Sequence, residues 1–264
     1  MKQNLILLFL ILLPTLANAG TAPPPTIPAA RPDPKAVLDY SRAVIRINCT
    51  AQFFDFQRPW TKKNPLTRRG LGAIIGPNEV LVSASLVAGA TYIEFERPTS
   101  AERTPALIKH IDYEANLALL EAADPAFLQN TQNLVLDETA RLGSIVEILQ
   151  LETNGEVAPT TGRITTITMA PGVIDDSLSL LIFRVTAPVQ QRDYSFVLPV
   201  VKDGRLLGMG VLYDSRNQTT DIIPPPIIRR FLQDAKEKTL HSFPRAGIRF
   251  TPLRNPQLRK YLQH

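Results

Sequence analysis

Few side chains in this sequence could act as a base, a nucleophile or a metal ligand, and they are widely spaced. The three histidines are scattered, at His110, His241 and His264. Transition-metal sites use closely spaced His and Cys ligands, so we expect no metal and no other cofactor. The only cysteine, Cys49, cannot form an internal disulfide. It falls on the same face of an alternating segment as Ile45 and Ile47, which predicts a buried thiol.

A serine hydrolase would need a nucleophile, a base and an acid that the fold brings together from separate segments. Three segments bear on this chemistry: residues 72–75 (G-A-I-I) with 80–90 (V-L-V-S-A-S-L-V-A-G-A), residues 112–120 (D-Y-E-A-N-L-A-L-L), and residues 194–208 (Y-S-F-V-L-P-V-V-K-D-G-R-L-L-G). In this order they resemble three motifs of the trypsin-like domain of the HtrA/Deg proteases. Those motifs are a glycine-rich strand leading to L-T-N-A-H-V-V-x-G-A, then D-x-x-x-D-L-A-L-L, then G-N-S-G-G-P-V-V-x-D-G-R-L-x-G.

In this register the resemblance places Ser85 where the family carries its histidine, Asn116 where it carries its aspartate, and Phe196 where it carries its serine. Val197 and Leu198 take the place of the two glycines that follow the nucleophile. A hydroxyl has no useful proton affinity, an amide brings no charge to stabilise an imidazolium, and a phenyl ring has no nucleophilic atom. We therefore expect a degenerate triad, a lost oxyanion hole and no catalytic residue.

Ser195 offers an alternative nucleophile, next to Phe196. That shift breaks the match over residues 199–204 and leaves no histidine near Ser85. His110 lies two residues before Asp112 and could be proposed as a relocated base, although its position favours a rim histidine. An active trypsin-like endopeptidase with a rearranged site thus stays open as the alternative.

Short apolar segments divided by Gly, Pro, Asn and Asp turns predict an all-β fold, a sandwich or a barrel. The expected strands are residues 43–49, 72–75, 80–84, 92–95, 106–111, 118–121, 144–151, 161–169, 180–184, 197–202 and 206–212. Residues 53–69 are expected to form a long loop, and residues 226–238 have the spacing of a helix. The resemblance implies a trypsin-like double six-stranded β-barrel closed by this C-terminal helix and followed by a short tail.

The two ends of the chain have their own composition. Residues 1–19 combine Lys2, an apolar run and Ala17-Asn18-Ala19, which predicts a signal peptide cleaved near Ala19 and a periplasmic or secreted protein. An uncleaved N-terminal anchor is the alternative. Residues 20–42 are expected to form a Pro-rich arm and a short helix, and residues 43–240 the protease-homology domain. Residues 241–264 resemble the start of a PDZ domain, which we interpret as a truncated PDZ-like stub.

The resemblance and the substitutions together favour an exported, inactive protease homologue that acts as a scaffold, adaptor or regulatory subunit. Active protease paralogues or unfolded polypeptide are the partners it implies, in a homo- or hetero-oligomer. A decayed gene product without a role is a further alternative. The net charge of +5 is modestly basic, and the expected compartment argues against nucleic acid as a partner.

Overall fold

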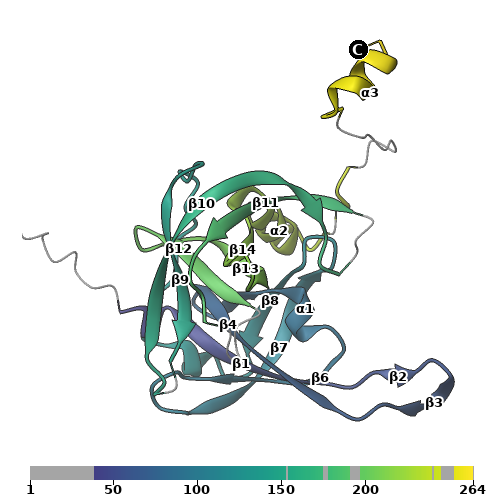
Figure 1. Cartoon of the computed structure of the whole chain (residues 1–264). Coiled ribbons are helices and arrows are strands. Elements are labelled where there is room, and N and C mark those ends of the chain that lie inside the picture. Colours follow the sequence, from purple (N-terminus) through teal and green to yellow (C-terminus); the bar gives the residue numbers. More distant parts are fainter. Residues whose placement is uncertain are drawn as a thin grey trace, which may run out of the picture. The chain divides into compact units, whose positions relative to one another are not determined.

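Twelve of the strands close into two six-stranded barrels (Figure 1). This computed structural model describes residues 39–152, 154–174, 178–190, 197–239, 241–244 and 253–263. The expected signal peptide, most of the Pro-rich arm and Phe196 lie outside the described residues. Closing a sheet leaves no unpaired edge, and antiparallel pairing joins neighbours around each barrel.

The first barrel contains, in order around it, β1 (Val44–Ala51), β4 (Leu66–Gly76), β5 (Glu79–Val82), β8 (Leu117–Ala122), β7 (Arg103–Asp112) and β6 (Ala90–Glu96). Its strands alternate as the sequence predicts. Ile45, Ile47 and Cys49 of β1 point into the core and are buried, whereas Arg46 and Asn48 between them are partly exposed. The prediction of a buried thiol is confirmed, and burial raises the pKa of Cys49.

The second barrel follows the order β10 (Val157–Pro171), β11 (Ser179–Thr186), β14 (Thr219–Ile223), β13 (Arg205–Asp214), β12 (Leu198–Lys202) and β9 (Ile145–Leu151). The segment between the barrels runs along both of them. In it, the Leu134 amide donates to the Ile74 carbonyl in the first barrel. The Asp137 amide donates to the Leu206 carbonyl in the second. Each barrel therefore has a fixed contact with the connecting segment.

The helices are short apart from one. They are η1 (Tyr40–Arg42), α1 (Ala84–Val87), η2 (Pro125–Leu128), α2 (Pro225–Glu237) and α3 (Pro256–Tyr261). Helix α2 confirms the helix predicted over residues 226–238, and its apolar face, with Ile227, Ile228 and Phe231, is buried in a core cluster to which strands of both barrels contribute. No helix in the described parts of the chain is long and apolar enough to cross a membrane.

The prediction of a long loop over residues 53–69 is wrong. Strands β2 (Phe54–Asp55) and β3 (Arg58–Lys62) pair as a hairpin, and β4 already begins at Leu66. The Asp55 carboxylate accepts the Gln57 amide at 2.9 Å and closes the turn. The exposed aromatic residues of this segment hid its strand character, because the pattern that predicts a strand normally has one buried face.

Smaller corrections concern the strand ends and one strand that the sequence did not predict. The strand expected over residues 80–84 ends at Val82, and α1 begins two residues later. Strand β14 was not predicted; its Asp221 is buried and forms a bidentate ion pair with Arg184 of β11, at 2.6 and 2.8 Å. Of the short helix expected up to Arg42, the described part is the single turn Tyr40–Arg42.

Candidate functional site

The first two motif segments meet at one end of the first barrel. Ser85 lies on α1, the single helical turn that follows β5. Asn116 lies in the turn between β7 and β8, immediately before Leu117. Because β5 pairs with β8, the two turns come side by side, and the Ala84 amide donates to the Asn116 carbonyl at 3.1 Å.

Ser85 and Asn116 are joined directly through the Asn116 side chain. The Asn116 Oδ1 accepts the Ser85 backbone N–H at 2.9 Å and the Ser83 hydroxyl at 2.8 Å. The hydroxyls of Ser83 and Ser85 are themselves 2.7 Å apart. We call Ser83, Ser85 and Asn116 the Ser–Ser–Asn cluster. It contains only neutral groups, so it can hold the local backbone but cannot take up a proton near neutral pH.

The backbone of Asn116 has an unusual conformation. Its φ is +53°, in the left-handed region that Asn tolerates better than other residues with a side chain. The residue is 4% exposed, and its Nδ2 is buried without a hydrogen-bond partner among the described residues. The two hydrogen bonds accepted by Oδ1 fix the orientation of the side-chain amide. Nδ2 therefore points away from Ser83 and from the Ser85 backbone N–H.

The third motif segment also reaches α1. The Val197 carbonyl accepts the Leu71 amide at 3.0 Å, which connects the start of β12 to β4. A Cβ placed on Gly70 would lie 2.9 Å from Leu86 of α1 and 3.3 Å from the Val197 Cβ, so the two side chains pack over this glycine. Val197 and Leu198 are both buried, and Leu198 is the first residue of β12. The structure therefore brings all three motif segments together, with Phe196 just beyond the described residues.

Arg68 joins the cluster to the hairpin β2–β3. Its guanidinium donates to the Ser85 carbonyl at 2.8 Å and to the Ala88 carbonyl at 3.1 Å, and it lies 5.4 Å from the centre of the Phe53 ring. The carbonyls at the end of a one-turn helix lack intrahelical donors. The Arg68 guanidinium supplies these missing donors. The sequence alone assigns no role to Arg68 or Ser83, because the contacts of both residues join segments that are far apart in the chain.

The described histidines lie elsewhere. The ring of His110 on β7 is 5.3 Å from the Phe231 ring of α2, so it belongs to the helix contact. The His241 ring is 2.7 Å from the buried Asp234 carboxylate. Burial alone would raise the pKa of Asp234, but the hydrogen bonds from the His241 side chain and backbone hold it below its ordinary value. Among the described residues, every recorded hydrogen bond of the Ser85 side chain and amide goes to Ser83 or Asn116.

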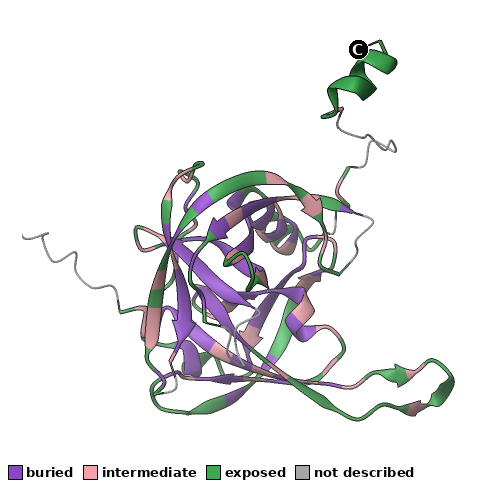
Figure 2. Cartoon of the chain, in the orientation of Figure 1, coloured by how far each residue is buried: buried purple, intermediate pink, exposed green. Residues whose placement is uncertain are grey.

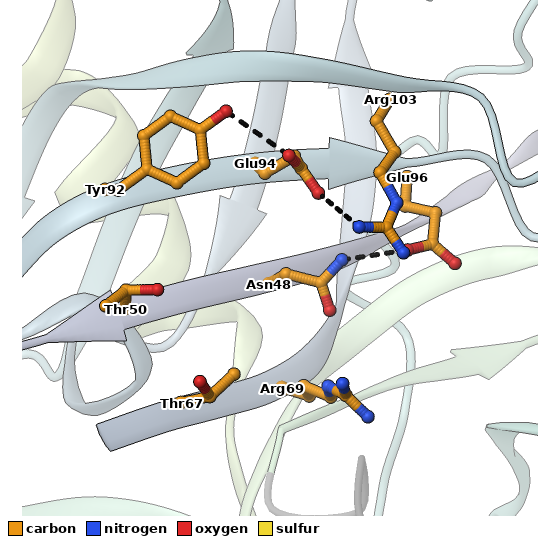
Figure 3. Close-up of a pocket in the computed structure, with 8 residues that line it drawn as sticks. All are labelled: Asn48, Thr50, Thr67, Arg69, Tyr92, Glu94, Glu96 and Arg103. Carbon is orange, nitrogen blue, oxygen red and sulfur yellow. Dashed lines mark hydrogen bonds and ion pairs between the residues drawn. The ribbon is translucent and has the colours of Figure 1, made fainter. Parts of the chain in front are cut away.

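A polar cavity of about 230 Å³ lies on the outer face of β4, β1, β6 and β7 (Figure 3). One of its lining groups is the buried carboxylate of Glu96, which accepts from Arg46 and Asn48 and pairs with Arg103 at 2.9 Å. Burial by itself would raise the pKa of Glu96, but these donors and the positive charge of Arg103 lower it. The ion pairs among the lining residues leave little net charge for a ligand, and we interpret this network as structural.

The described residues contain no group of three or more His, Cys, Asp or Glu side chains arranged to hold a metal ion. The chemistry of the Ser–Ser–Asn cluster agrees with this observation, because a hydroxyl pair and one amide are poor ligands for transition metals. The interactions within this site are therefore hydrogen bonds between neutral groups.

Comparison with curated proteins relates the chain to proteases. It is 24% identical over 238 residues to Protease Do-like 2, chloroplastic, of Arabidopsis thaliana, and 21% identical over 225 residues to the serine protease DegP homolog of Plasmodium falciparum. These alignments cover 88% and 84% of this chain. Its homologues are HtrA/Deg serine proteases. The chain spans only 39% and 26% of the length of these two relatives, and no protein-family model matches it.

Solved structures give the same fold for this HtrA/Deg homologue. The active form of the Rv3671c protease from M. tuberculosis superposes with a TM-score of 0.59 at 21% identity, over 87% of this chain and 97% of that protease. The HtrA-type protease AlgW, solved with a decapeptide, gives 0.62 at 17% identity, over 86% of this chain and 74% of AlgW. The expected trypsin-like double barrel with a C-terminal helix is therefore confirmed.

Proposed function

We propose that this HtrA/Deg homologue is a catalytically inactive, exported protein that acts as a scaffold, adaptor or regulatory subunit. The observation that carries the proposal is the direct contact between Ser85 and Asn116. The register of the motifs gives these residues the base and acid positions of a triad, and in the structure the Asn116 side chain accepts the Ser85 backbone N–H. Neither residue can transfer a proton near neutral pH.

The orientation of the Asn116 amide adds a second argument. Its Oδ1 is already occupied by two donors, and its Nδ2 can only donate a hydrogen bond. An amide N–H donating to an imidazole fixes the tautomer that cannot accept the serine proton, and this exchange alone costs about 10⁴ in turnover in a serine protease. Loss of a whole triad costs about a millionfold. Phe196, which has no nucleophilic atom, completes the argument from the sequence.

Export, partners and assembly follow as parts of the same proposal. The composition of residues 1–19 supports export, and the resemblance of residues 241–264 to the start of a PDZ domain stays a prediction. A retained double barrel without turnover could bind unfolded polypeptide or join active protease paralogues. The homologues that the comparisons identify are named as proteases, which makes such paralogues the first partners to seek.

The register can be tested without any activity by introducing the missing base. We would compare Ser85→His with the double variant Ser85→His/Asn116→Asp and measure the pKa of the introduced imidazole by NMR titration, subtracting the signals of the native histidines. If positions 85 and 116 are a base–acid pair, the carboxylate should raise that pKa by about 1–3 units relative to the single variant.

The matched control is Ser85→His/Asn130→Asp, which adds a carboxylate at an exposed asparagine that also has a positive φ. It should leave the pKa of the imidazole nearly unchanged. Equal values in all three variants would contradict the register and with it the proposed degenerate triad. Labelling of the unmodified chain by a fluorophosphonate, which reacts with activated serines, would contradict the inactive reading directly and favour the rearranged endopeptidase.

A further inference from the structure

The hairpin β2–β3 extends from the first barrel and carries exposed aromatic side chains (Figure 1). Phe56 is 92% exposed and Trp60 is 81% exposed, and Phe54 is also exposed. Phenylalanines of the barrels, η2 and α2 behave differently, because Phe95, Phe127, Phe183 and Phe231 are all buried. Figure 2 shows the hairpin as the most continuously exposed pair of strands. Its aromatic residues therefore contribute nothing to the core of the protein.

The same segment holds most of the net positive charge. Residues 52–69 contain five basic side chains and one acidic one, a net charge of +4, whereas the whole chain carries +5. The basic residues are Arg58, Lys62, Lys63, Arg68 and Arg69. The first three lie on or next to the exposed strands, and the Lys62 ammonium is 5.4 Å from the centre of the Phe54 ring. Aromatic and cationic groups are thus interleaved on one projecting element.

The stem of the hairpin is fixed to the barrel, which presents the tip in a defined direction. Phe53 packs so closely on Gly89 that a Cβ there would lie 2.5 Å from the ring. The Gln52 amide donates to the Gly89 carbonyl, and the Lys63 amide donates to the Phe53 carbonyl at 2.8 Å. Arg68 adds its bonds to Ser85 and Ala88 below the stem. The side chains of Phe56 and Trp60, beyond this stem, are exposed.

We propose that the tip of this hairpin inserts into the headgroup region of an anionic phospholipid bilayer and holds the protein at the membrane surface. Trp and Phe prefer the boundary between headgroups and acyl chains, where a ring is buried beside polar groups. Lys and Arg next to them are attracted by anionic lipids. The net positive charge of the hairpin complements such a surface. This proposal does not depend on whether the protein cleaves substrates.

Trp60 is the only tryptophan in the chain, so its fluorescence reports on the tip alone. The whole chain would be mixed with vesicles of phosphatidylglycerol and phosphatidylcholine, and with phosphatidylcholine vesicles. We expect a blue shift of the emission with the anionic vesicles only. Lipids brominated on the acyl chains should quench it, and about 0.5 M salt should reverse the binding by screening the charges.

Variants separate the electrostatic contribution of the lysines from the hydrophobic contribution of the aromatic side chains. Each basic residue near an anionic surface adds to the electrostatic attraction between protein and lipid. Removing two of them with Lys62→Gln/Lys63→Gln should therefore weaken partitioning about 25-fold. The control, Lys236→Gln/Lys238→Gln, removes the same charge from the exposed end of α2 and should leave the partitioning within about twofold of the native value. Phe56→Ser should weaken it by about tenfold, because it removes a buried ring from the bound state.

Three results would overturn the proposal. The first is the absence of binding to anionic vesicles. The second is binding with unchanged and unquenched Trp60 emission, which would place the membrane contact elsewhere in the chain. The third is a blue shift that appears without lipid and grows with protein concentration, since the hairpin would then contact a second copy of the chain.

Discussion

Replacing Asn116 with alanine should destabilise the protein through two separable effects. The side chain gives the Ser85 backbone N–H its recorded hydrogen-bond acceptor at 2.9 Å, and the site is buried. Leaving such a donor unsatisfied costs about 2 kcal/mol. The Ser83 hydroxyl loses less, because it can still bond to the Ser85 hydroxyl 2.7 Å away. Alanine in the left-handed conformation, φ +53°, adds about 1 kcal/mol.

The expected total is about 3 kcal/mol, which for a domain of this size corresponds to a fall of roughly 6–12 °C in the melting temperature. Thermal unfolding followed by circular dichroism would measure it. Asn116→Gly relieves the backbone and should recover about 1 kcal/mol of the loss. Asn130→Ala is the matched control, because Asn130 has a φ of +62° but is exposed; it should cost only about 1 kcal/mol. If Asn116→Ala costs no more than Asn130→Ala, the Ser–Ser–Asn cluster does not stabilise the site.

Other consequences can be measured in the same way. Gly72→Ala should destabilise by about 1–3 kcal/mol in chemical denaturation, because its Cβ would lie 2.4 Å from Val80 Cγ1 inside the first barrel; a neutral result would contradict the packing there. The pKa of Glu96 is lowered in the folded protein, so at acidic pH the unfolded state binds more protons than the folded state. The contribution of Glu96 to the free energy of unfolding is therefore complete above the ordinary pKa of glutamate, about 4.3. It is lost as the pH falls through the lower folded value. Glu96→Gln should flatten this acid limb of the stability curve, and an unchanged limb would show that the network with Arg46 has no such role. Cys49 should react with Ellman's reagent only on unfolding, since it is fully buried and its pKa is raised; rapid reaction of the folded protein would contradict this burial.

The parts of the fold that the sequence predicts are those where a local pattern has one physical cause. The alternation of Ile45, Ile47 and Cys49 in β1 reflects a single buried face, and the helical spacing of Ile227, Ile228 and Phe231 reflects another. Both elements, β1 and α2, are present in the structure because burial and local conformational preference favour the same secondary structure. The closure into two six-stranded barrels came only from the resemblance, since periodicity does not specify which strands pair.

The features that the sequence did not predict have two origins: contacts between distant residues, and strands that have no buried face. Strand β14 places Asp221 in a buried position that is stable only because Arg184 lies opposite it. The hairpin β2–β3 exposes its aromatic side chains, so the burial that normally reveals a strand is absent. At the candidate site the sequence identified Ser85 and Asn116 but not Ser83. The role of Ser83 depends on an asparagine 33 positions away.

The most direct test of the central claim is the degradation of unfolded casein by the whole purified chain over a long incubation, with Ser195→Ala as the control. The proposed function predicts intact casein with both proteins. Fragments that the native chain produces and Ser195→Ala does not, with contaminating proteases excluded, would contradict the claim. They would show that the site has been rebuilt around Ser195.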